Sequence, residues 1–216
     1  MSGNDVLNWT YSDKFTRLPR WSLCYFWGKE KPTSMAKQLF NLPDRAVQQW
    51  KSFKVDEQEF DLSHLDALKI TFTHPKRDES YTLFFTLSHH TFTRSIRHGE
   101  EVAKEKLYPY QPDLRVFDET RYMLSRHLPQ IIETLPEQFC YHGGYTRYCS
   151  CMLKDDEGND VNYQVVYRVW KERGKMRFHV ESAYPLDVRP SRPKKVDFWV
   201  ICHNLLRNKP MPDPGA

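Results

Sequence analysis

The stretch Met176–Pro185, "MRFHVESAYP", constrains the fold of this chain more than any other segment, because apolar and polar residues alternate along it. Successive side chains of a β-strand point to opposite faces. One face of the predicted strand is therefore apolar. The other carries a base, an imidazole and a carboxylate, namely Arg177, His179 and Glu181. The pattern predicts a strand that covers a core with one side only.

Other segments predict further strands with short polar connections. Leu68–Thr73 and Tyr81–Ser88 flank the polar "HPKRDES", which is typical of a β-hairpin. From Phe139 on, "FCYHGGYTRYCSCML", "DVNYQVVYRVW" and "KMRFHVESAY" are separated by the turn signals "KDDEGN" and "KERG". These connections favour an antiparallel arrangement.

Helical spacing occurs in two segments. Ser34–Phe53 is interrupted at Pro43 and predicts one or two short helices, and Asp118–Leu135 predicts a helix capped by Asp118 and kinked at Pro129. The segment "KKVDFWVICHNLLRNKP" is interpreted as a strand that continues into a short helix. The fold class predicted is α+β, a mainly antiparallel β-sheet with two or three helices packed on one side.

The 216 residues contain no repeat and no evident linker, which favours a single domain over 1–216. Within it, 1–55 are interpreted as a partly helical N-terminal extension, 56–209 as the α+β core and 210–216 as a flexible tail. The N-terminus lacks the apolar run of a signal peptide, and no run approaches the roughly 18–20 residues that cross a bilayer. Five cysteines, an odd number, favour reduced thiols. We therefore expect a cytoplasmic protein without a membrane partner.

The polar strand face suits phosphodiester chemistry. Residues two apart on a strand lie about 6.5–7 Å from each other. Arg177, His179 and Glu181 can therefore surround one scissile phosphate, with a base for the ribose 2′-hydroxyl, an acid for the leaving oxygen and a cation for the developing charge. Such cleavage requires no metal and no cofactor. The alternative is a solvated face, since exposed strand faces often carry mixed charges.

A second group, "SHHTFTR" (Ser88–Arg94), follows an apolar strand, a place where functional side chains are often held. His90 and Arg94, with Arg97 and His98 beyond them, can bind a phosphate or donate a proton. The alternative is that one of the paired histidines caps the strand and the other is solvated.

A third group, "RVFDETRYMLSRHLP", combines basic residues with tyrosine on a predicted helix. Its members Arg115, Arg121, Tyr122 and Arg126 suit contact with an RNA backbone, where stacking and phosphate pairing work together. The alternative is a solvated amphipathic helix. The mildly basic net charge of +4 permits a phosphate-bearing partner without requiring one.

Metal binding and nucleotide chemistry are less well supported. Cys140, His142, Cys149 and Cys151 are four soft ligands within twelve residues, but neither cysteine pair has the spacing of a zinc knuckle. Whether they bind zinc stays open. The sequence lacks the phosphate-loop and serine-nucleophile motifs, which excludes those two classes of enzyme.

The chain also resembles two groups of proteins. "SHHTFTR", "RVFDETRYMLS", "VESAYP" and "WVICHNLLRNKP" resemble a group of poorly characterised bacterial proteins. Separately, "FHVESAYP" is similar to the closing strand of metal-independent ribonuclease toxins of the barnase, colicin and RelE-like class. That resemblance implies RNA cleavage, with Ser182 and Tyr184 beside the scissile phosphate and His90 and Arg94 contributing from upstream. The toxin domains are typically much shorter than this chain.

Two hypotheses follow. The first is a metal-independent endoribonuclease of toxin or phage-defence type that acts on RNA, with a neutralising antitoxin or another protein as a candidate partner. Its catalytic candidates are His90, Arg94, Arg177, His179, Glu181 and Tyr184, and its RNA-binding candidates are Arg97, His98, Arg115, Arg121, Tyr122 and Arg126. The second is a non-catalytic protein- or RNA-binding module, with an exposed surface of tyrosines and arginines such as Tyr108, Tyr110 and Arg121.

Overall fold

The structure, a computed structural model, describes residues 48–109, 114–138, 140–143, 146–154, 160–187 and 195–211. The strands, in chain order, are β1 (Phe53–Val55), β2 (Gln58–Phe60), β3 (Leu68–Thr73), β4 (Ser80–Leu87), β5 (Thr93–Ser95), β6 (Leu107–Tyr108), β7 (Arg115–Phe117), β8 (Cys140–Gly143), β9 (Thr146–Lys154), β10 (Asp160–Glu172), β11 (Lys175–Pro185) and β12 (Lys195–Val196). The α-helices are α1 (Glu119–Ser125), α2 (Leu128–Glu133) and α3 (Phe198–Leu206).

Within the described residues, the main sheet has seven strands in the order β12-β8-β9-β10-β11-β4-β3. Strands β11 and β4 run parallel, and the other pairings recorded within this sheet are antiparallel. The parallel pair joins the two halves of the chain, since Met176 lies beside Leu83 and Val180 beside Leu87. The predicted α+β class with a mainly antiparallel sheet is confirmed.

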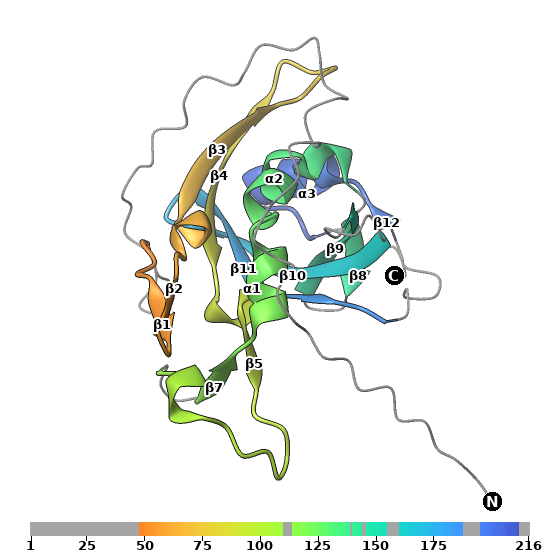
Figure 1. Cartoon of the computed structure of the whole chain (residues 1–216). Coiled ribbons are helices and arrows are strands. Elements are labelled where there is room, and N and C mark those ends of the chain that lie inside the picture. The colour runs from red at the N-terminus through yellow and green to blue at the C-terminus, as the bar shows by residue number, and fades with distance from the viewer. Residues whose placement is uncertain are drawn as a thin grey trace, which may run out of the picture.

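The predicted hairpin is confirmed within one residue at each strand. Strands β3 and β4 pair from Leu68 opposite Phe85 to Thr73 opposite Ser80. Figure 1 shows this hairpin reaching away from the rest of the sheet. At the turn between β10 and β11, Arg173 and Gly174 both have positive φ, 47° and 75°. That backbone region is readily adopted by glycine and suits a tight turn between twisted strands.

One face of the sheet forms the hydrophobic core, and the helices cover it. Phe178 lies at its centre, with ring centroids 4.8 Å from Phe85 and 4.3 Å from Tyr167. Helix α3 packs there through Phe198, whose ring lies 5.1 Å from that of Phe72. Helix α2 lies on the same side and contributes Leu128, Ile131 and Ile132 to the same cluster (Figure 1). These contacts confirm the prediction that helices pack on one side of the sheet.

The segment that contains α3 has the predicted order of a strand followed by a helix, but the helix is the longer of the two. The strand β12 is two residues long. Asp197 then accepts a hydrogen bond from the backbone N–H of Trp199 at 2.7 Å and caps the helix. Phe198, Ile201, Cys202 and Leu205 are buried at helical spacing. A cap followed by that spacing favours a helix over a strand.

The predicted helix over Asp118–Leu135 is divided in two. Asp118 caps α1 as predicted, because its carboxylate accepts from the N–H of Arg121 at 2.9 Å. The chain leaves the helix at Arg126 and His127, and Pro129 lies in the first turn of α2. Proline is favoured in a first turn, where its missing N–H has no helical partner to bond.

The end of the predicted helix over Ser34–Phe53 is not helical. Residues 48–52 form no helix, and Phe53 begins β1. Long-range contacts hold this segment: the N–H of Trp50 donates to Asp66 at 2.8 Å, and its ring lies 5.3 Å from that of Phe92. The rest of that predicted helix lies outside the described residues, as do the rest of the predicted extension and the tail from residue 212.

A small second sheet, ordered β5-β7-β6, lies beyond the end of β4. It is reached through the short 3₁₀ turn η3 (His89–Thr91). None of the helices in the described ranges combines the length and the apolar character that a membrane crossing requires.

Candidate functional site

Most of the sequence-predicted residues lie in two neighbouring regions. One is the face of the main sheet opposite the core, which we call the outer face. The other is the turn η3 with the small sheet and the start of α1. Strand β11 belongs to the first region, and η3 packs against it.

Strand register assembles a row of side chains across the outer face. Lys69 on β3 lies opposite Phe84 on β4, Phe84 lies beside Arg177 on β11, and Arg177 lies opposite Trp170 on β10. Cations and aromatic rings therefore alternate over four adjacent strands. We call Lys69, Phe84, Arg177 and Trp170 the cation–aromatic row.

The cations of this face lie over its rings. The Nζ of Lys69 is 5.8 Å from the centroid of the Phe84 ring, the Nζ of Lys175 is 5.2 Å from it, and the Cζ of Arg177 is 5.3 Å from it. The Cζ of Arg168 is 5.4 Å from the Trp170 ring. Contacts within about 6 Å are attractive because the ring face is electronegative. Each ring of the row is thus held beside positive charge.

The members of this face differ in their access to solvent. Lys175 is exposed, and the side chain of Arg168 keeps 57 % of its surface exposed. Lys69, Phe84 and Trp170 are half-buried. Arg177 is only 4 % exposed and forms an ion pair with Glu172 at 3.3 Å. Arg177 therefore positions its neighbours, whereas the other cations can reach a ligand.

His179 follows Arg177 on the same face and lies between Thr86 and Arg168. Its Nδ1 and the hydroxyl of Thr86 are 2.8 Å apart. Burial, with the charges of Arg168 and His90 adding to it, lowers the pKa of His179 to about 4. The imidazole is therefore neutral at pH 7, and the structure brings it close to His90.

Glu181 and Tyr184 continue this face beyond a β-bulge. Val166 pairs with Ser182 and Tyr167 with Val180, so Glu181 is the additional residue of the bulged strand. The carboxylate of Glu181 lies 3.4 Å from the Nε of Arg168. The bulge changes the alternation, so that Ala183 is buried while Ser182 and Tyr184 remain half-buried. The Tyr184 ring lies 5.3 Å from the Cζ of Arg121 on α1.

The turn η3 holds the paired histidines. The hydroxyl of Ser88 accepts from the N–H of His90 at 3.2 Å and caps the turn. His89 is buried, and its ring centroid lies 4.4 Å from that of His90. Burial, with the charges of His90, Arg115 and His179 adding to it, lowers the pKa of His89 to about 3. Here too the imidazole is neutral at pH 7.

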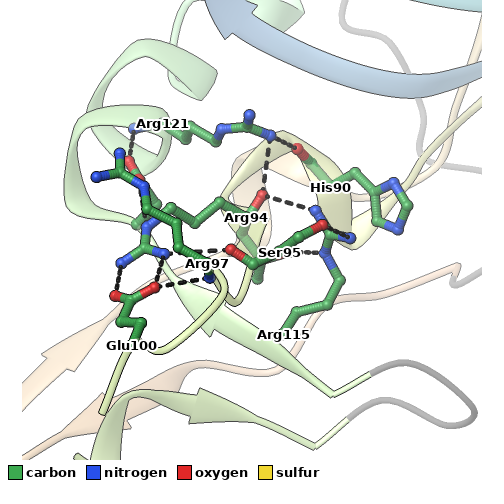
Figure 2. A network of polar contacts seen from close by, with 9 residues as sticks. His90, Arg94, Ser95, Arg97, Glu100, Arg115 and Arg121 are labelled. Carbon is green, nitrogen blue, oxygen red and sulfur yellow. Dashed lines mark hydrogen bonds and ion pairs between the residues drawn. The ribbon is translucent and has the colours of Figure 1, made fainter. Parts of the chain in front are cut away.

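Arginines surround this turn in a network of internal contacts (Figure 2). Arg121 donates through Nη1 to the carbonyls of His90 and Thr93, at 3.1 and 2.9 Å. Arg115 is buried and donates to the Thr93 hydroxyl at 2.9 Å and to the Ser95 hydroxyl at 3.2 Å. Burial lowers the pKa of Arg121. Both guanidinium groups therefore hold the turn and β5 in place.

Arg94 is engaged in ion pairs. Its guanidinium donates to the two carboxylate oxygens of Glu100 at 2.7 and 2.5 Å, and its Nε lies 3.4 Å from Asp118. The Arg94 hydrogen bonds and the backbone N–H of Arg97 lower the pKa of Glu100 to about 2. This fork fixes the loop after β5.

The remaining predicted residues are scattered. His98, Arg126 and the side chain of Arg97 are exposed. Tyr122 is buried and donates to the Asp61 carbonyl at 3.2 Å. Tyr108 is half-buried with its ring 5.0 Å from that of Phe92, and Tyr110 lies outside the described residues.

Beside α1 lies a hollow of about 470 Å³. Apolar side chains such as Met123, Leu124 and Val161 line it together with Arg94 and Lys106. Asp118 and Glu119 line it as well, so its two cations are balanced by two acids. The hollow therefore offers no clear preference for an anionic ligand.

Sequence reasoning did not name Lys69, Phe84, Arg168, Trp170 or Lys175. A signal was present, because Phe84 and Trp170 are large aromatic residues at the positions of their strands that point away from the core. What the sequence could not supply is the register that places them in one row.

The possible zinc ligands are only partly described. Cys140 is a buried free cysteine, as is Cys202. The side chains of His142, Cys149 and Cys151 lie outside the described part of the structure. Among the side chains that are described, no group of three metal-ligating residues occurs.

Comparison with known proteins places this chain in a family. The sequence model of the YjaZ family matches residues 52–206, from the start of β1 to the end of α3. Protein YjaZ of Escherichia coli K12 is 36 % identical over 175 residues, which cover 78 % of this chain and 97 % of that protein. No solved structure matches, and these matches give no support to the resemblance to ribonuclease toxins. The chain belongs to the YjaZ family.

Proposed function

We propose that this protein binds single-stranded RNA through the outer face of its main sheet. The observation that carries the proposal is the cation–aromatic row together with Lys175 and Arg168 beside it, so that two rings lie among four cations. Single-stranded nucleic acids bind surfaces that offer rings for the bases and positive charge for the phosphates. In this proposal Phe84 and Trp170 stack on bases, while Lys69, Lys175 and Arg168 contact phosphates.

The contacts favour binding over cleavage. Arg94 and Arg177 are held by Glu100 and Glu172, and the carboxylate of Glu181 lies beside Arg168. His179 has a pKa of about 4, far from the value near the operating pH that suits a general acid or base. The proximity of His90 and His179 nonetheless keeps cleavage as a second candidate, which the same experiment tests.

The experiment measures the affinity for a short fluorescent single-stranded RNA by anisotropy, at several salt concentrations. Trp170→Leu removes a stacking surface worth about 1–3 kcal/mol per base. Lys175→Gln removes a phosphate contact and reduces the slope of log K against log salt by about 0.7. Lys104→Gln is the matched control, because Lys104 is exposed on the 3₁₀ turn η4 (Lys104–Lys106), outside the row.

Equal affinities for wild type, Trp170→Leu and Lys175→Gln contradict the proposal, as does equal binding of DNA of the same sequence. Denaturing gels of the same mixtures, with chelator present, test cleavage. Intact RNA together with salt-dependent binding is the expected result. Cleavage that is lost in a folded His90→Ala/His179→Ala variant favours the endoribonuclease instead.

A further inference from the structure

The spacing of the two rings restricts which RNA this face can take. Phe84 and Trp170 lie on β4 and β10, with β11 between them. Neighbouring strands are about 4.8 Å apart, so the two rings arise from backbones roughly 10 Å apart. Consecutive bases in a stacked helix are about 3.4 Å apart. Two consecutive bases that remain stacked therefore cannot reach both rings.

We infer that this face selects single-stranded RNA whose neighbouring bases are unstacked, and that it prefers uridine-rich over adenosine-rich strands. The inference rests on the proposed function and adds a ligand class to it. Uridines stack weakly and adenosines strongly, and preferences of this kind arise from stacking strength and backbone flexibility. In an adenosine-rich RNA, two neighbouring bases have to unstack from each other before they can stack on both Phe84 and Trp170.

The charges between the rings suit this arrangement. A linkage that joins two separated bases crosses β11, where Arg177 lies between Phe84 and Trp170. Arg177 is covered and paired with Glu172, so it does not itself reach the phosphate. Lys175 and Arg168 flank it on the exposed surface and can do so. The ring spacing and the cation positions thus both suit a splayed pair of nucleotides.

The test compares oligouridine and oligoadenosine of equal length with the full chain, at one salt concentration. Oligouridine is expected to bind about tenfold more tightly, since one stacking step in a duplex is worth about 1.4 kcal/mol and that free energy is a factor of ten. A hairpin in which the same uridines are paired is expected not to compete. Equal or tighter binding of oligoadenosine overturns the inference and leaves the proposed function standing. Binding of neither oligomer overturns both.

Variants of the rings separate selectivity from affinity. With one ring removed, the RNA no longer has to place bases on two separate rings. Trp170→Leu is therefore expected to bring the ratio of the affinities for oligouridine and oligoadenosine close to one. Phe84→Leu is expected to do the same from the other ring, with circular dichroism confirming that each variant is folded. Lys104→Gln retains the ratio. A ratio unchanged in both folded ring variants contradicts the inference even where their affinities fall.

Discussion

At the scale of single residues, histidines whose pKa values are lowered in the folded state make this fold sensitive to acid. His89 and His179 lie near Arg115 and Arg168, and their pKa values are lowered to about 3 and about 4. A group whose pKa is lower in the folded state than in the unfolded chain contributes stability that is lost as the pH falls below the unfolded value, about 6.5 for histidine. Protonation of these histidines therefore favours the unfolded chain as the pH falls from about 6.5 toward their lowered pKa values.

We predict that the free energy of unfolding decreases by on the order of 2 kcal/mol for each of these histidines between about pH 7 and about pH 5. Glu79 and Glu100, with pKa values near 2, are not yet protonated in this range. Urea denaturation at several pH values measures the effect. His179→Gln is expected to lose less stability on acidification than wild type, while His98→Gln, at an exposed position, behaves like wild type. Identical pH profiles for wild type and His179→Gln contradict the assignment.

The strand alternation predicted which residues of Met176–Pro185 face the core, and Met176, Phe178 and Val180 are indeed buried there. It could not predict that Arg177 is covered as well, because its partners Phe84 and Glu172 come from other strands. Nor does alternation reveal the bulge at Glu181, which depends on how β10 and β11 pair. The alternation within a strand determines which face of the sheet a side chain lies on, whereas the register with strands distant in sequence determines which side chains it contacts.

At the scale of elements, features that depend on residues close in sequence were predictable, whereas the pairing of strands distant in sequence was not. The β3–β4 hairpin and the cap at Asp118 rest on residues a few positions apart. The parallel pairing of β4 with β11 joins segments that are 93 residues apart at Thr86 and His179, and no local pattern encodes it. The helix predicted near residues 48–53 was wrong for the same reason, since Trp50 is held by Asp66 and Phe92.

Asp118 has two separable roles at the start of α1. It caps the helix through the N–H of Arg121 and pairs with Arg94. We predict that Asp118→Ala lowers the free energy of unfolding by about 1 kcal/mol or more, because both interactions are lost. Asp118→Asn retains a capping oxygen and loses only a partly exposed ion pair, so it is expected to stay within about 1 kcal/mol of wild type. Urea midpoints compare the three proteins, and equal losses for the two variants contradict the capping role.

At the scale of the whole molecule, one hydrophobic cluster joins the sheet, the three helices and β1. Such a continuous core favours a single cooperative unfolding transition. Phe178 is at its centre and Phe84 lies on the opposite face of the same sheet. Substitutions of Phe178 therefore test the stability of the core, and substitutions of Phe84 test the outer face.

We predict that Phe178→Ala lowers the free energy of unfolding by about 3–5 kcal/mol, because it leaves a cavity between Phe85 and Tyr167. Phe84→Ala is expected to cost clearly less, since its ring is half-buried and solvent can replace part of what it contacts. Thermal and urea unfolding, followed by circular dichroism and tryptophan fluorescence, measure both. Equal losses, or transitions that differ between the two probes, contradict a single core centred on Phe178.

The parallel pairing of β4 with β11 also has a consequence for synthesis of the chain. Strand β4 leaves the ribosome long before the strand that completes its second edge, because Thr86 and His179 are 93 residues apart. At about 5–20 residues per second, the interval is roughly 5 to 20 s. During that interval the inner edge of the β3–β4 hairpin is open to pairing with other chains. We therefore expect the release of β11 from the ribosome, rather than the folding of the β3–β4 hairpin alone, to close this edge.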